Sequence, residues 1–145
     1  MNLDEIYTEL IAEHNQNKKN KRSLDNPTIV EHGHNPSCGD EISINLKLNE
    51  DKIEDLSYEG QGCAISQASS SIMIDILKGK TANEAKELIE IYLKMIKREE
   101  NDDEVLKEKL EEAYIFKNIS NMPSRVKCAV LAWHTLDEAI RKVGN

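Results

Sequence analysis

The sequence has no long apolar run and few clustered basic residues. No stretch of its 145 residues approaches the continuous apolar length of a membrane-spanning helix. The formal net charge is -8, which opposes nucleic-acid binding because phosphates are held mainly by grouped lysines and arginines. Asp4 and Glu5 stand where a secretory signal would need positive charge followed by apolar sequence. We therefore expect a cytoplasmic protein with neither a membrane nor a nucleic acid as partner.

Cysteine is also scarce, since the chain has only Cys38, Cys63 and Cys128. Three thiols cannot all pair as disulfides within one chain. Three thiolates and one carboxylate can instead fill a tetrahedral metal site, and Asp40 follows two residues after Cys38. A single free cysteine is often just a small buried apolar residue. The joint pattern, with glycine beside two of the cysteines and a carboxylate near one, favours a shared metal or sulfur site.

The composition is typical of one globular domain, with 39% hydrophobic and 32% charged residues. Residues 42–48 alternate apolar and polar side chains and residues 53–58 return after a turn, which predicts an antiparallel hairpin with a β-bulge near Asp55. We read 23–37 as an irregular arm with a short extended piece at 28–30. Helical periodicity appears in five further segments: 3–11, 65–77, 85–96, 106–114 and 126–143. Thr81 and Glu84 match a capping box, which predicts the start of the third of these helices.

Strands followed by helices, with no repeated crossovers, favour an α+β domain in which helices pack on one face of a small antiparallel sheet. The candidate ligands then lie at the ends of elements. Cys38 and Asp40 point the same way from an extended segment, and Gly39 allows a tight turn between them. Cys63 lies between a strand end and a helix start, and Cys128 lies in the first turns of the last helix. A helix amino terminus favours the thiolate form of a nearby cysteine.

The histidines are competing ligands. His32 and His34 stand two residues apart and close to Cys38, a spacing that could bind zinc. We favour the alternative that they lie on a flexible, solvated arm. His134 is six residues past Cys128, which places it about 240° away around a helix and facing elsewhere. For His14, at a helix end, we expect no chemical role.

Three motifs together resemble the NifU N-terminal or IscU-like iron–sulfur assembly proteins, and most closely their SufU branch. They are Asn35-Pro-Ser-Cys-Gly-Asp40, Tyr58-Glu-Gly-Gln-Gly-Cys-Ala-Ile-Ser66 with the serines that follow, and Arg125-Val-Lys-Cys-Ala129. The resemblance covers nearly the whole chain, as a single domain over 1–145. It implies a compact α+β fold in which Cys38, Asp40, Cys63 and Cys128 are the ligands of a metal or cluster.

Two features separate the branches of that family. IscU-type scaffolds have a histidine directly before the last cysteine, where this chain has Lys127. Residues 96–122 resemble the helical insertion of SufU-type proteins. The resemblance therefore implies a zinc-dependent sulfurtransferase that accepts persulfide sulfur from a SufS-type cysteine desulfurase and passes it to downstream iron–sulfur assembly proteins. We expect Cys38 to be the acceptor, because it shares the Gly39 loop with a weak carboxylate ligand.

Two other functions remain open at this point. A scaffold could hold iron or assemble a transient [2Fe-2S] cluster on the same residues, and a non-catalytic interaction domain could hold a structural zinc. Arg125 and Lys127 either offset the negative charge of the site or are ordinary surface charges at a helix start. The sequence does not choose the native metal.

Overall fold

The fold combines a three-stranded antiparallel sheet with helices on one of its faces, as the sequence predicted. The computed structural model describes residues 3–100 and 102–144. Its elements are, in order, α1 (Leu3–Gln16), β1 (Ile29–Asn35), β2 (Asp40–Asn49), β3 (Lys52–Gln61), α2 (Ala64–Leu77), α3 (Ala82–Ile96), α4 (Asp103–Leu110), the 3-10 helix η1 (Glu111–Asn121) and α5 (Pro123–Gly144). Within this described part, no helix combines the length and apolar character needed to cross a membrane.

Strand β2 is the centre of the sheet, with the order β1-β2-β3. Its inward side chains Ile42, Ile44 and Leu46 are completely buried, as the alternating pattern predicted. The register with β3 shifts after Lys47, which pairs with Asp55, while the next residue pairs with Ile53. The predicted bulge is therefore confirmed at this point of the hairpin.

Strand β1 corrects the prediction of an irregular arm. It pairs with β2 over seven residues, from Ile29 opposite Leu46 to Asn35 opposite Asp40. The sequence does not predict this strand, because it lies at the sheet edge and carries polar side chains and a glycine in place of an apolar stripe. Its far end brings Asn35 and Asp40 together at the turn that contains Cys38.

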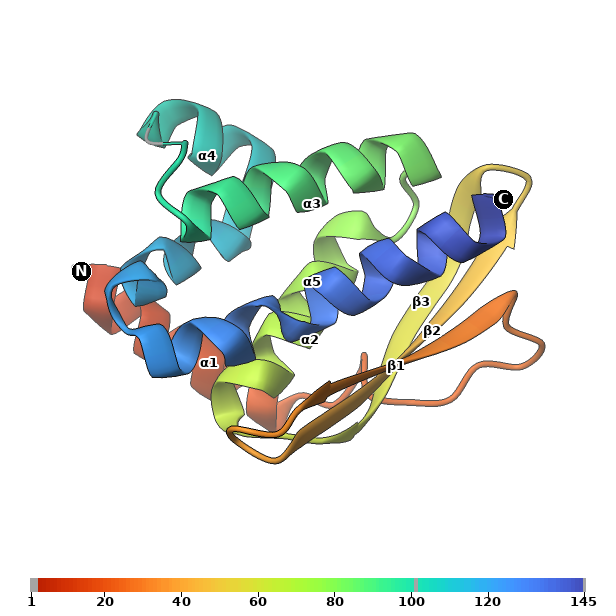
Figure 1. The fold of residues 1–145 in the computed structure, drawn as a ribbon, viewed down its shortest axis with the longest axis horizontal. Helices are drawn as coiled ribbons and strands as arrows, with labels where there is room; N and C mark the ends of the chain where they lie inside the picture. Colours follow the sequence, from red (N-terminus) through yellow and green to blue (C-terminus); the bar gives the residue numbers. More distant parts are fainter. Residues whose placement is uncertain (1–2, 101, 145) are drawn as a thin grey trace.

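The helices form two layers over the sheet (Figure 1). Helices α2 and α5 contact the strands, whereas α3 packs on α5, α4 and η1. The predicted capping box of Thr81 and Glu84 starts α3. The helix predicted over 106–114 is wrong in its second half, because α4 ends at Leu110 and the chain continues as η1.

A buried hydrogen-bonded cluster fixes the first half of α5. The rings of Tyr92 and Trp133 stack with centroids 3.8 Å apart. The Tyr92 hydroxyl donates to the carbonyl of Ala129 at 2.8 Å, and the Ser69 hydroxyl donates to the same carbonyl at 2.6 Å. The Trp133 indole N–H in turn donates to Ser69 Oγ at 3.0 Å. These bonds between α2, α3 and α5 hold Cys128, the neighbour of Ala129, in a defined position.

Candidate metal centre

The four predicted ligands lie in or beside a strand end, a turn and two helix starts. Cys38 lies in the turn between β1 and β2, and Asp40 is the first residue of β2. Gly39 has φ +72°, a conformation that side chains rarely adopt. Cys63 caps the amino terminus of α2, and Cys128 lies in the second turn of α5.

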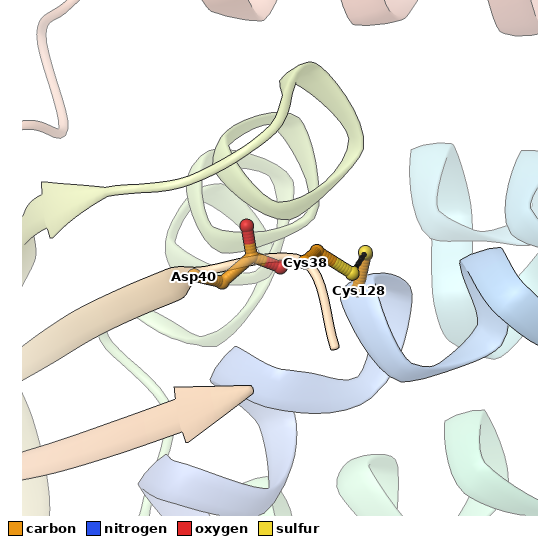
Figure 2. Close-up of side chains that lie close together, drawn as sticks. All are labelled: Cys38, Asp40 and Cys128. Atoms are coloured by element: carbon orange, nitrogen blue, oxygen red, sulfur yellow. Dashed lines mark hydrogen bonds between the residues drawn. The ribbon is translucent and has the colours of Figure 1, made fainter. Parts of the chain in front are cut away.

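Three of the four predicted ligands are in direct proximity (Figure 2). The sulfur atoms of Cys38 and Cys128 are 2.8 Å apart. One carboxylate oxygen of Asp40 and these two sulfurs all lie within 4.8 Å of one another. Two thiolates on one tetrahedral zinc stand roughly 3.8 Å apart, because each Zn–S bond is about 2.3 Å long. Metal binding therefore needs a separation of about 1 Å more, which the exposed loop of Cys38 can supply.

Cys63 lies beside this group. Its backbone N–H donates to Asp40 Oδ1 at 2.8 Å, and its own sulfur accepts the backbone N–H of Ser66 at 3.4 Å. Cys63 lines a cavity of about 560 Å³ together with Cys38 and Cys128. The structure thus gathers Cys38, Asp40 and Cys128 most tightly and places Cys63 at the wall of the same cavity.

Asp40 shows that the site suits a cation. Its side chain is completely buried, and among the described residues its Oδ2 atom has no hydrogen-bond partner. Leaving a carboxylate oxygen buried and unpaired is costly, and a metal ion removes that cost. Gly62 keeps the space open, since a Cβ there would lie 2.9 Å from Asp40 Oδ1 and 3.1 Å from Ser66 Oγ.

The protonation of Cys128 corrects one expectation. The amino terminus of α5 was expected to favour its thiolate, but burial raises the pKa of Cys128 well above its ordinary value. The neighbouring acid groups of Cys38, Cys63 and Asp40 raise this pKa further. Without a metal, burial among acid groups therefore favours the neutral thiol of Cys128.

Asn35 is a site residue that the sequence reasoning missed. Its amide nitrogen donates to the sulfur of Cys38 at 3.1 Å and reaches the sulfur of Cys128 at 3.9 Å. Its carbonyl oxygen accepts the backbone N–H of Ser37 at 3.2 Å. The signal available in the sequence was an asparagine before a proline, a common turn former, three residues before the first cysteine.

Arg125 and Tyr7 line the cavity, while Lys127 is exposed and is not among its lining residues. Burial raises the pKa of the Tyr7 hydroxyl, and the Arg125 guanidinium beside it offsets part of that rise. Of the two cations named from the sequence, Arg125 is therefore the one near the thiols. Tyr7 had no signal in the sequence beyond its place on the apolar stripe of the first helix.

The histidines lie away from the thiols. His32 and His34 are exposed on β1, where His32 Nδ1 is 2.7 Å from Ser43 Oγ and His34 Nε2 is 3.8 Å from a Glu41 carboxylate oxygen. Both side chains are solvated as expected, but they belong to a paired strand and not to an irregular arm. His134 is exposed on α5.

His14, for which no chemical role was expected, is buried at the end of α1. Its Nδ1 lies 2.7 Å from Ser71 Oγ on α2, and its Nε2 lies 3.4 Å from a Glu112 carboxylate oxygen on η1. The ring therefore links three helices. Its role in the fold is structural, and it lies outside the group of thiols.

Comparison with known proteins places this architecture in a family. The family model of the NifU-like N terminal domain matches residues 6–106. Across the full length, the chain is 44% identical over 140 residues to the iron–sulfur cluster assembly scaffold protein IscU of Thermotoga maritima, covering 97% of this chain and 96% of the relative. It is 38% identical over 141 residues to the zinc-dependent sulfurtransferase SufU of Bacillus subtilis, covering 97% and 93%.

Solved structures agree with these relatives. A crystal structure from Fervidobacterium islandicum, described as an assembly scaffold protein for the SUF system, superposes with a TM-score of 0.86 at 40% identity and covers 94% of this chain and 97% of that one. The NifU-like amino-terminal domain of Brucella abortus gives a TM-score of 0.82 at 25% identity, with coverage of 97% and 96%. The chain belongs to the IscU/SufU family of iron–sulfur cluster assembly proteins, which share the NifU-like N-terminal domain.

Proposed function

We propose that this protein is a zinc-dependent sulfurtransferase of iron–sulfur cluster assembly, which accepts persulfide sulfur from a SufS-type cysteine desulfurase on Cys38. The observation that carries the proposal is the unequal exposure of three thiols gathered at one cavity. Cys38 is exposed, Cys63 is half-buried and Cys128 is buried. A partner protein can therefore reach the Cys38 sulfur first, while the other two stay behind it.

The donor set suits zinc. Cys38, Cys63 and Cys128 supply three sulfurs and Asp40 supplies one oxygen, which are ligand types that zinc accepts in four-coordinate sites. Bound Zn²⁺ would keep all three cysteines as thiolates at neutral pH, and the combined formal charge of ion and ligands, -2, would leave the sulfurs electron-rich. Arg125 on the cavity wall would offset part of this charge.

The transfer step balances as a thiol–persulfide exchange. The Cys38 thiolate attacks the outer sulfur of the persulfide on the partner cysteine. A new S–S bond forms on Cys38, the S–S bond of the partner breaks, and the partner cysteine leaves as a thiolate. Cys38 then carries the persulfide, and no external oxidant or reductant is consumed. Its position between Asn35 and Asp40, on a turn with a glycine at its tip, lets the sulfur move outward.

The cavity offers a surface for the approach of the partner. Tyr7, Ile11 and Ile65 present apolar area beside the thiols, and Arg125 adds a positive charge. An extended segment that carries a persulfide can bury its apolar neighbours here while the negative sulfur faces the guanidinium. We expect downstream assembly proteins to collect the sulfur from the same exposed position.

A desulfurase assay tests the proposal. Addition of this protein to a SufS-type desulfurase should increase the rate of cysteine consumption, and the Cys38→Ala variant should lose the increase. Mass spectrometry should then find one added sulfur atom on the Cys38 peptide of the wild type. A folded wild-type protein, loaded with zinc, that neither stimulates the desulfurase nor gains sulfur would reject this function.

A scaffold that assembles a [2Fe-2S] cluster on the same ligands is the second candidate. The similarity to proteins named as scaffolds favours it, and thiolates are also the usual ligands of such clusters. Reconstitution with iron and sulfide distinguishes the two. Stable visible absorption after desalting would support the scaffold, whereas a colourless protein that keeps its zinc would support the sulfurtransferase.

A further inference from the structure

Both polar atoms of the Asn35 side-chain amide form hydrogen bonds beside the thiols. Asn35 ends β1 and is only 5% exposed. Its nitrogen donates to Cys38 Sγ at 3.1 Å and lies 3.9 Å from Cys128 Sγ, while its oxygen accepts the N–H of Ser37 at 3.2 Å. One buried amide thus connects the two closest sulfurs to the turn that carries one of them.

An amide is the group that this position requires. The turn needs an acceptor for the Ser37 N–H, and the sulfurs need donors. Aspartate would offer acceptors alone, and an aliphatic side chain of the same shape would offer neither. The backbone pairing of Asn35 with Asp40 also fixes the amide at a strand end, directly across from a predicted ligand.

The three thiols differ in the donors that hold them. Cys63 accepts the backbone N–H of Ser66, which belongs to the first turn of α2 and is independent of any side chain. Apart from the thiol of Cys128, the described donor to the Cys38 sulfur is the Asn35 side chain. A change at Asn35 therefore acts mainly on Cys38, which accepts its shorter hydrogen bond and is the thiol with the greatest exposure.

We propose that Asn35 is the positioning residue that keeps the Cys38 sulfur beside Cys128 and sets how readily Cys38 leaves the metal. Hydrogen bonds from N–H groups to a thiolate are charge-assisted and stabilise it in one orientation. The inference rests on the proposed function for its metal, since the amide controls release of the same sulfur that accepts the persulfide. Changes in residues that support metal ligands typically alter affinity by about 10–100-fold.

Two variants distinguish loss of the amide donor to the sulfurs from loss of the acceptor that supports the turn. Asn35→Asp keeps an acceptor for the Ser37 N–H but has no amide hydrogens, and Asn35→Ala loses both functions. The zinc-loaded proteins are mixed with a chromogenic chelator, and the rate of zinc release is measured. Both variants should release zinc about 10–100-fold faster than the wild type. Iodoacetamide labelling followed by mass spectrometry should show Cys38 modified earlier, with Cys63 and Cys128 still protected.

Asn45→Ala is the matched control. Asn45 is equally buried, at 2% exposed, but its amide donates to Ser57 Oγ and to a Glu59 carboxylate oxygen within the sheet. This variant should lose stability yet release zinc at the wild-type rate. Equal release rates for the Asn35 and Asn45 variants would overturn the proposal, as would a uniform gain in labelling at all three cysteines.

A second readout needs no metal. In nitrogen-15 spectra of the metal-free protein, the side-chain amide signals of Asn35 should shift in Cys38→Ala, whereas those of Asn45 should stay in place. Unmoved Asn35 signals would count against the hydrogen bond and hence against the proposal. A wild-type protein that binds no zinc but shows the shift would reject the proposed function and the control of metal release, and would leave only the positioning of the Cys38 sulfur by Asn35.

Discussion

Replacement of Asp40 by asparagine should raise the stability of the metal-free protein and reduce the extra stability that zinc adds. Asp40 is completely buried, and its Oδ1 accepts the Cys63 N–H at 2.8 Å, a bond that the asparagine oxygen can keep. Among the described residues the other oxygen has no partner. Asp40→Asn replaces this buried acidic oxygen with a neutral amide that can donate to the nearby Cys128 sulfur, which lies within 4.8 Å of the carboxylate.

The magnitudes follow from the burial of that oxygen. An unsatisfied buried polar group costs about 1–3 kcal/mol, so the metal-free Asp40→Asn protein should be more stable by roughly this amount. For a chain of this size, each kcal/mol shifts the melting temperature by about 3 °C. The same change removes an anionic ligand, so the zinc affinity should fall by at least about 100-fold. At saturating zinc this loss removes about 2.7 kcal/mol of metal-dependent stability.

Calorimetry of both proteins, with excess chelator and with excess zinc, measures the two effects. Asp55→Asn is the control, because Asp55 is paired with Arg22 and Lys78 at the sheet and is outside the group of thiols. The wild type should melt below Asp40→Asn in chelator and show the larger rise with zinc. A metal-free Asp40→Asn protein that melts below the wild type, or an equal rise with zinc, would refute the reasoning.

Two further changes test the site and the fold. Gly62→Ala should weaken zinc binding by about 10-fold or more, because the new Cβ would press on Asp40 Oδ1 and Ser66 Oγ. Chelator competition measures the zinc affinity. An unchanged affinity would show that this contact is unimportant. Hydrogen bonds from Arg22 and Lys78 hold the pKa of Asp55 well below its usual range. The ionised Asp55 side chain therefore adds to the free energy of unfolding above about pH 4, and this stabilisation is lost as the pH falls further. Asp55→Asn should therefore reduce the unfolding free energy by about 1 kcal/mol at pH 7 and by progressively less below pH 4. Urea titrations at several pH values measure this. A difference between wild type and variant that does not depend on pH would contradict the ion pairs.

The strongest sequence patterns predicted the parts of the fold that have one clear apolar face. The β2–β3 hairpin followed from strict alternation, and α3 followed from its helical period together with the Thr81 capping box. Strand β1 was not predicted, because an edge strand with His32, Gly33 and His34 has no such face. The end of α4 was not predicted, because the apolar spacing in η1 resembles that of an α-helix, although the backbone of η1 is wound more tightly.

The predicted site residues were found by their chemical type, since few residue types bind a soft cation and this chain has three cysteines. The sequence could not show what surrounds them. The donation of Asn35 to Cys38 depends on the pairing of β1 with β2, which was not foreseen. The raised pKa of Cys128 depends on burial and on Cys38, Asp40 and Cys63, which are distant in sequence. Neighbourhoods of this kind arise from tertiary contacts and leave no local pattern.

X-ray absorption at the zinc edge, on protein purified without added metal, tests most directly that four side chains bind one ion. We expect one zinc per chain with three sulfurs at about 2.3 Å and one oxygen at about 2.0–2.2 Å. The sulfur count should fall by one in each of Cys38→Ala, Cys63→Ala and Cys128→Ala. A shell of nitrogen and oxygen atoms alone, or a sulfur count that one of these substitutions leaves unchanged, would contradict the shared site.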